Sequence, residues 1–251
     1  MYLPWLKKYN LLTFDKIDST NSEAIRLVKA GVRGDHVIWA SSQSVGRGTH
    51  GRRWTSEYGN LYLSLLLDRN IITETLPQLS FVTALALRST IAQIAGKEKQ
   101  KLIGLKWPND VLYDGKKIGG ILLESIKVKA QNYLVIGVGV NILNCPTNLD
   151  RPVTSLLAEG IVVKKYGQEL NIFMHHFDKF FDKWQNKGFG AIRKEWLSGA
   201  EYLHKTVCIN DGNNNITGIF KTISKDGTIV IKLASGEKIN ISSGEVANKS
   251  T

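Results

Sequence analysis

The chain has 251 residues, of which 43% are hydrophobic and 22% are charged, a balance that excludes a disordered or fibrous protein. Its length suits one large domain, or one domain with a smaller one beside it. The net charge of +11 favours an acidic partner such as a nucleotide, a nucleic acid or an acidic protein. Because the basic residues are dispersed, charge alone does not choose among these partners.

Cysteines and apolar runs indicate the compartment. Cys145 and Cys208 lie in unrelated segments and match neither a disulfide framework nor a metal-ligand spacing, which favours a reducing compartment. No apolar run approaches the ~18 residues of a membrane span, and the first ten residues lack a secretory pattern. We therefore expect a cytoplasmic protein with no membrane partner.

Hydrophobic patterning predicts a mixture of strands and helices over the first 200 residues. A capping box from Thr20 to Glu23 starts the first helix, and Asp114-Gly115 predicts a hairpin turn. The predicted strands span residues 11–17, 37–40, 61–67, 102–107, 121–128 and 133–140. The predicted helices span residues 20–31, 76–95, 166–187 and 191–197.

The pattern changes near Leu203. Four short strands are predicted, at residues 205–210, 216–222, 228–233 and 238–241. Turn dipeptides such as Asp-Gly separate them, a spacing typical of a small β-barrel. We therefore predict an α+β domain over residues 1–202 and a small all-β domain over residues 203–251.

A glycine- and arginine-rich loop covers residues 46–54. Its G-x-G-x-x-G spacing leads toward a strand, whereas a dinucleotide-binding fingerprint opens a helix. It is no P-loop either, because Arg52-Arg53 stand where Lys and Ser or Thr are required. Glycines allow close approach to a ligand, and arginines suit carboxylate or phosphate. The loop either orders over an anionic ligand or is a solvated surface loop.

A second cluster, Lys106 to Asp110, follows a predicted strand. Lys106 is placed as a fixed charge for an oxyanion or phosphate, and Asn109 and Asp110 could reach a hydroxyl or a magnesium ion. The alternative is a strand-ending turn with an extended lysine. Glycines within 117–121 and 137–141 indicate either a ligand against the sheet or tight packing.

These motifs occur together and in this order in biotin protein ligases, which the chain resembles along nearly its whole length. The motifs that carry the resemblance are Ser19-Thr20-Asn21, Gln43, Gly46 to Trp54, Lys106 to Asp110, Lys117 to Ile121 and Gly137 to Asn141. The resemblance implies a class II synthetase-like biotin/lipoate ligase catalytic domain, with a mixed, largely antiparallel sheet and helices. It also implies a C-terminal SH3-like β-barrel.

The resemblance implies an ATP-dependent biotin–[biotin carboxyl-carrier protein] ligase. Biotin and MgATP would give biotinyl-5′-AMP and pyrophosphate. The biotinyl group would then pass to one lysine of the biotin carboxyl carrier domain of a biotin-dependent carboxylase. Arg47 and Lys106 are the expected catalytic residues, because they would offset the repulsion between a carboxylate and a triphosphate.

The matched motifs also imply which residues bind each substrate. The expected biotin-binding residues are Ser19, Thr20, Asn21, Gln43, Gly46, Arg47, Gly48, Thr49, Lys106 and Gly120. The expected ATP-binding residues are Arg47, Trp54, Lys106, Asn109 and Asn141. Asp110 is the implied contact of Mg²⁺.

Two departures from the family pattern bear on function. Thr49-His50 stand where some relatives carry two arginines, which puts a loop function of the second arginine in doubt. Only eighteen residues precede Ser19, too few for the winged-helix domain of bifunctional relatives, so we expect no repressor function and no specific DNA partner. A homodimer is left open. The alternatives are a lipoate or octanoate ligase of the same fold and a basic nucleic-acid-binding protein.

Overall fold

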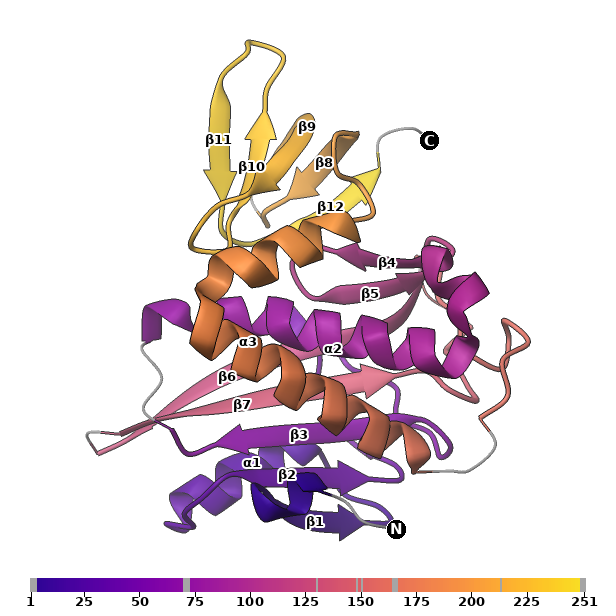
Figure 1. The fold of residues 1–251 in the computed structure, drawn as a ribbon, viewed down its shortest axis with the longest axis vertical. Helices are drawn as coiled ribbons and strands as arrows, with labels where there is room; N and C mark the ends of the chain where they lie inside the picture. Colours follow the sequence, from indigo (N-terminus) through magenta and orange to yellow (C-terminus); the bar gives the residue numbers. More distant parts are fainter. Residues whose placement is uncertain are drawn as a thin grey trace.

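The computed structural model describes residues 4–69, 73–129, 131–147, 149, 151–163, 167–212 and 214–248. Over these residues the chain forms a seven-stranded sheet, a five-stranded sheet and three α-helices (Figure 1). The larger sheet contains β1 (Asn10–Phe14), β2 (His36–Ala40), β3 (Leu61–Leu67), β4 (Ile103–Lys106), β5 (Asp110–Tyr113), β6 (Lys116–Val128) and β7 (Gln131–Val140). The helices are α1 (Thr20–Lys29), α2 (Gln78–Ala95) and α3 (Gln168–Ser198). The smaller sheet contains β8 (Thr206–Asn210), β9 (Asn215–Ile223), β10 (Ile229–Lys232), β11 (Lys238–Ile241) and β12 (Glu245–Asn248).

The larger sheet has the order β1-β2-β3-β7-β6-β5-β4, in which β1 and β2 pair in parallel and the other neighbours pair antiparallel. Its centre is the long β6–β7 hairpin. The predicted α+β class with a mixed, largely antiparallel sheet is thereby confirmed.

Helices cover both faces of this sheet. Along β3, Leu63 and Leu65 share a core with α2 and α3, which lie across one face in Figure 1. Leu66 points to the opposite face, where it packs with Ala24 and Val28 of α1. Every residue of β3 is therefore buried, which explains its nearly continuous apolar sequence.

The two helices that the sequence predicts before the C-terminal strands meet at a kink inside α3. The kink is at Gly188, between the predicted segments 166–187 and 191–197, and its φ of 69° and ψ of 174° are non-helical values that glycine adopts at little cost. The first part of α3 stacks Phe173, Phe177 and Phe181 in a row, with ring centroids 6.0 and 5.6 Å apart. Tyr166, the predicted start of the helix, lies outside the described residues.

Other boundaries differ by a few residues. β1 ends at Phe14 rather than at residue 17, because the chain turns toward α1 and the Ile17 N–H donates to the Ser42 carbonyl. β6 begins at Lys116 and is therefore longer than the predicted strand at 121–128.

The C-terminal strands form an antiparallel sheet with the order β11-β10-β9-β8-β12. The sequence predicts four of these strands and misses β12, whose four residues include only two apolar side chains. The sheet joins the rest of the molecule through Trp107, whose Nε1 donates to the Gly227 carbonyl at 3.1 Å.

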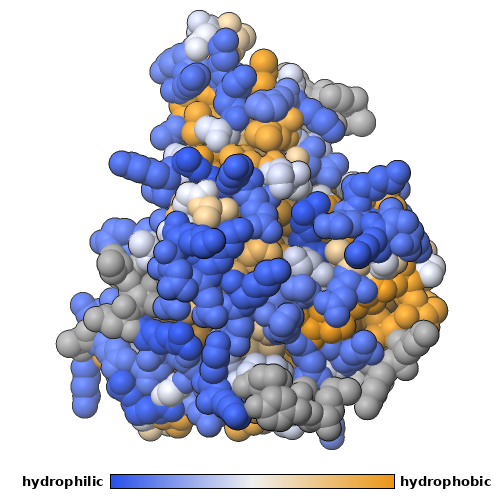
Figure 2. Space-filling view, in the orientation of Figure 1, coloured by the Kyte–Doolittle hydropathy of each residue, from blue (hydrophilic) through white to orange (hydrophobic). Residues whose placement is uncertain are grey.

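The face of the molecule in Figure 2 is mostly hydrophilic, with hydrophobic residues gathered over the segment that follows β7. Leu143, Leu149, Leu157 and Val162 in this segment are 41–70% exposed. Among the described helices, none combines the length and apolar content needed to cross a bilayer.

The aromatic row on α3 predicts a large loss of stability when one ring is removed. Phe177 is fully buried, so Phe177→Ala should lower the free energy of unfolding by about 3–5 kcal/mol. Urea denaturation measures this loss. Lys179→Ala, at an exposed position of the same helix, is the control. A loss below about 1 kcal/mol in Phe177→Ala would contradict the placement of this row in the core.

Candidate functional site

One pocket brings together most of the residues that the sequence singles out. Twelve of the predicted site residues line it: Ser19, Thr20, Asn21, Gln43, Arg47, Gly48, Thr49, Trp54, Lys106, Asn109, Asp110 and Gly120. They come from the start of α1, the loop after β2, the turn between β4 and β5, and β6. The fold thus joins motifs that lie about a hundred residues apart in the chain.

Ser19, not Thr20, caps α1. The Ser19 Oγ accepts a hydrogen bond from the Ser22 N–H at 3.4 Å, and the Glu23 N–H donates to the Ser19 carbonyl. The predicted capping box was therefore displaced by one residue, and the Glu23 carboxylate instead pairs with Arg26 at 2.7 Å. This leaves the Thr20 hydroxyl to face the pocket.

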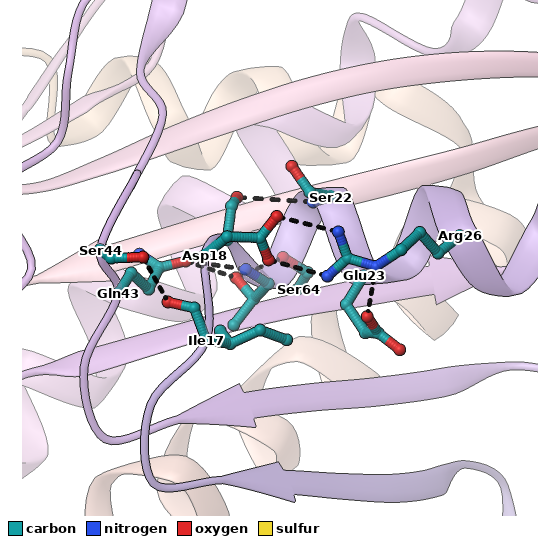
Figure 3. A network of polar contacts seen from close by, with 10 residues as sticks. Ile17, Asp18, Ser22, Glu23, Arg26, Gln43, Ser44 and Ser64 are labelled. Carbon is teal, nitrogen blue, oxygen red and sulfur yellow. Dashed lines mark hydrogen bonds and ion pairs between the residues drawn. The ribbon is translucent and has the colours of Figure 1, made fainter.

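Polar contacts gather at the start of α1, where Gln43 and Ser64 lie near the ion pairs of Arg26 with Asp18 and Glu23 (Figure 3). The Gln43 Oε1 accepts from the Thr20 backbone N–H at 2.8 Å and from the Thr20 hydroxyl at 3.1 Å. The Ser64 hydroxyl lies 2.8 Å from Thr20 Oγ1 and 2.5 Å from Asn21 Oδ1. Ser64 was missed by the sequence analysis, although a lone serine in the apolar strand β3 is a visible signal.

The glycines of β6 and β7 make room for side chains of the pocket itself. A Cβ at Gly137 would lie 2.3 Å from Asn21 Oδ1, and one at Gly139 would lie 2.6 Å from the Trp54 ring. A Cβ at Gly120 would lie 3.0 Å from the same ring. These glycines pack tightly against Asn21 and Trp54, and Gly120, Gly137 and Gly139 also line the pocket, so both interpretations left open by the sequence stay compatible with the fold.

The glycine-arginine loop folds back on itself. The Gly48 N–H donates to the Arg52 carbonyl, and the Trp54 N–H donates to the Gly46 carbonyl. Only a short 3-10 turn at Thr49–Gly51 lies between, so the loop opens no helix, as predicted. Gly46 lies behind the pocket, since a Cβ there would come within 2.4 Å of the Ser56 hydroxyl and the Trp54 carbonyl.

Two N–H groups of this loop are buried without a partner among the described residues, Arg47 Nε and Trp54 Nε1. Arg47 is otherwise held by Glu124, whose Oε2 lies 2.6 Å from Arg47 Nη2. Buried donors are nearly always satisfied in folded proteins. These two donors are therefore available to acceptor oxygens or nitrogens of a ligand.

At the other end of the loop, arginines meet the C-terminal sheet. Arg52 and Arg151 both pair with Glu245 at the start of β12, at 2.8 and 3.2 Å. Burial raises the pKa of the Glu245 carboxyl, but the hydrogen bond from Arg52 and the charges of Arg52, Lys106 and Arg151 together outweigh it, so the net pKa lies below the usual value. The pocket wall therefore includes a charged residue of the C-terminal sheet.

Lys117 is a pocket residue that the sequence analysis did not place in the site. Its ammonium group lies 5.3 Å from the centre of the Trp54 ring and forms a buried ion pair with Asp110. Burial lowers the pKa of Lys117, and the Asp110 carboxylate only partly offsets this effect. A pair of lysines just before a glycine-bearing strand was the available signal.

The ion pair with Lys117 bears on the predicted magnesium contact. The Asp110 carboxylate is already neutralised, and within the described residues no three His, Cys, Asp or Glu side chains come together. The residues present therefore do not fit a metal cage built by the protein.

Asn109 and Asn141 have different positions. Asn109 lines the pocket and donates to the Ile121 carbonyl at 2.7 Å. Asn141 is buried beside a neighbouring pocket that shares Arg52, Trp54 and other residues with the first. Its amide donates to the Thr154 carbonyl at 2.9 Å, so its contacts here hold the segment after β7.

Comparison with protein families identifies the family to which this chain belongs. Residues 13–141 match the model of the biotin/lipoate A/B protein ligase family, and residues 202–247 match that of the biotin protein ligase C-terminal domain. The chain belongs to the biotin/lipoate A/B protein ligase family. The motif resemblance found in the sequence is thereby confirmed.

The similarity to individual members of this family covers most of the chain. The chain is 32% identical over 235 residues to a biotin–[acetyl-CoA-carboxylase] ligase of Paracoccus denitrificans, covering 89% of this chain and 95% of the relative. The biotin protein ligase of Aquifex aeolicus, solved in complex with biotin and ATP, is 29% identical with a TM-score of 0.78, covering 95% and 97%. The biotin protein ligase of Leishmania major, solved with biotinyl-5-AMP, is 26% identical with a TM-score of 0.65, covering 93% and 99%.

The ion pair that anchors α1 predicts a pH dependence of stability. Arg26 donates to both carboxylate oxygens of Asp18 and lowers the pKa of Asp18 to about 2, from 3.8. The stabilisation is present above pH 3.8 and is lost as the pH falls through about 2. Because both groups are well exposed, it amounts to less than about 1 kcal/mol.

We therefore expect Asp18→Asn to have a lower Tm than the parent at pH 5, and the difference to shrink by pH 2. Thermal unfolding followed by circular dichroism measures both values. Arg26→Gln should show the same pattern, because it removes the other partner. A difference in Tm that is unchanged at pH 2 would contradict this assignment.

Proposed function

We propose that the protein ligates biotin to one lysine of a biotin carboxyl carrier domain, using ATP and passing through biotinyl-5′-AMP. The observation that carries this proposal is the pocket with two unlike ends. Neutral hydrogen-bonding groups of Thr20, Asn21 and Gln43 lie at one end. Cationic groups line the adjoining end, where Arg47, with its unpartnered Nε, lies next to Asn21 because both donate to one oxygen of Glu124.

The neutral end suits the ring system of biotin, which is uncharged and carries both donors and acceptors. Thr20, Asn21 and Gln43 already hold one another in place, so little ordering remains to be done when a ligand binds. Ser19 positions these groups by capping α1, and Gly120 brings the sheet close. Gly46, Gly48 and Thr49 shape the loop that would close over the ligand.

The cationic end suits the reacting groups. An oxygen of the biotin carboxylate attacks the α-phosphorus of ATP, the bond to the β-phosphate oxygen breaks, and pyrophosphate leaves. Both reactants are anions, so Arg47 and Lys106 lower the barrier by offsetting their repulsion and stabilising the charge of the transition state. Lys117 adds no net charge to this pair, because its ammonium group is already paired with Asp110.

The second step is acyl transfer. The uncharged ε-amine of the acceptor lysine attacks the acyl carbon of the mixed anhydride, the amide bond forms, and the bond from the acyl carbon to the phosphate oxygen breaks. AMP leaves with the negative charge of its phosphate, and the proton lost by the amine passes to solvent. The loop 46–54 would exclude water from the anhydride until the acceptor arrives. Relatives named as biotin–[acetyl-CoA-carboxylase] ligases support a carboxylase carrier domain as the acceptor.

For the nucleotide, we propose contacts from Arg47, Trp54, Lys106 and Asn109, all of which line the pocket. Asn141 would act indirectly, through the wall of the neighbouring pocket. Mg²⁺ would enter bound to the triphosphate, a mode that needs at most one or two protein carboxylates. We assign no step to Asp110, since Lys117 holds its carboxylate.

We also propose that residues 1–202 form the catalytic domain and residues 203–251 an SH3-like domain that completes the pocket through Glu245. Use of ATP and of a carrier protein supports a cytoplasmic location.

The test of function is pyrophosphate release from ATP without an acceptor, compared for biotin, lipoate and octanoate. We expect release with biotin alone. Release with lipoate or octanoate instead would favour a ligase for those acids. No release with any of them, together with salt-dependent DNA binding, would favour a nucleic-acid-binding protein.

In the same assay, Lys106→Ala should slow biotin-dependent pyrophosphate release by about a hundredfold, because it removes a charge that stabilises the transition state. Its Tm should match that of the parent. Lys101→Ala, an exposed lysine just before β4, is the control and should leave the rate unchanged. A parental rate in Lys106→Ala would remove this residue from the catalytic assignment.

A further inference from the structure

Glu124 on β6 links two parts of the pocket that the sequence treats as separate. One oxygen, Oε2, accepts from Arg47 Nη2 at 2.6 Å and from Asn21 Nδ2 at 2.7 Å. Arg47 belongs to the loop after β2, and Asn21 belongs to α1. A single carboxylate oxygen therefore joins the neutral end of the pocket to its cationic end.

The bond to Asn21 sets the orientation of an amide. With Nδ2 directed at Glu124, Oδ1 faces the Ser64 hydroxyl at 2.5 Å. A carboxylate accepts hydrogen bonds and donates none, so it selects the amino side of the amide. The second Nδ2 hydrogen is left for a ligand acceptor.

The bond to Arg47 sets the orientation of a guanidinium group. Glu124 engages Nη2, while Nε is buried without a partner among the described residues. A guanidinium group is planar, so holding one corner fixes the direction of the others. Glu124 therefore holds Arg47 in a position where Nε remains available to an anionic oxygen.

We propose that Glu124 is a positioning residue for the ligation reaction, orienting Asn21 for biotin and Arg47 for the biotinyl-5′-AMP phosphate. This inference rests on the proposed function. Glu124 is not among the residues that line the pocket, so it would act through these two partners. Its negative charge holds the Arg47 guanidinium group, whereas Asn21 needs only an acceptor oxygen at the same place.

Two substitutions separate these roles. Glu124→Gln keeps an acceptor oxygen but no charge, so the Kd of biotin alone should stay within about twofold, while biotinyl-5′-AMP should dissociate about tenfold faster. Glu124→Ala removes both bonds, so it should also raise the Kd of biotin by about fivefold. Calorimetry measures the first quantity, and release of preformed radiolabelled adenylate measures the second.

Glu195→Gln is the matched control, because Glu195 forms a similarly exposed ion pair with Lys183 on α3. It should change neither quantity, and all variants should keep the parental Tm to within a few degrees. In an Arg47→Ala background, Glu124→Gln should alter adenylate dissociation by less than about twofold, since the charge then has no partner.

The outcomes are distinct. If the parent forms no adenylate from biotin and ATP, the proposed function fails and this inference fails with it. If the parent forms adenylate and Glu124→Gln retains it as well as the parent does, the proposed function stands and the role of Glu124 is refuted. A full tenfold effect of Glu124→Gln in the Arg47→Ala background would also refute it, because Glu124 would then act by another route.

Discussion

The site depends on how closely side chains can approach the β6–β7 hairpin. Asn21 and Trp54 lie directly on this hairpin, at positions where a Cβ on Gly137 or Gly139 would come within 2.3–2.6 Å of them. An alanine at either position would displace one of these side chains and with it the polar network of α1 or the end of the loop. Glycine in the middle of a central strand weakens the sheet, and here that cost accompanies a close contact that only glycine allows.

Electrostatic balance is the second constraint. Four cations of the pocket have a carboxylate partner: Arg47 with Glu124, Lys117 with Asp110, and Arg52 and Arg151 with Glu245. Without these partners, like charges would face one another across a small volume. With them, the pocket keeps a positive excess for anionic ligands while the fold bears little repulsion.

The sequence predicted the strands and helices of the larger sheet well, because β3 and α2 carry long apolar runs with clear ends. It failed where a tertiary contact decides the outcome. The capping residue of α1 is Ser19 because the Thr20 hydroxyl is engaged by Gln43 and Ser64, from distant segments. β12 forms because β8 offers it a neighbouring edge, not because its own four residues favour a strand.

The same reasoning applies to the site. Motif order grouped the residues that line the pocket, because each motif lies at the end of a recognisable element. It did not reveal Ser64, Lys117 or Glu124, whose roles arise from contacts with residues of other elements. Nor did it show that Asn141 is turned toward Thr154, since one backbone carbonyl decides that orientation.

Trp107 connects the C-terminal sheet to the end of β4, where Lys106 lies. Trp107 and its neighbours Lys106 and Pro108 all line the pocket, and the Trp107 side chain is buried with its Nε1 donating to the Gly227 carbonyl. The turn at Gly227 thus supports a segment 120 residues earlier in the chain. A substitution in this turn would displace Lys106 slightly without contacting it. The sequences of the C-terminal sheet and of the catalytic pocket are therefore constrained to evolve together.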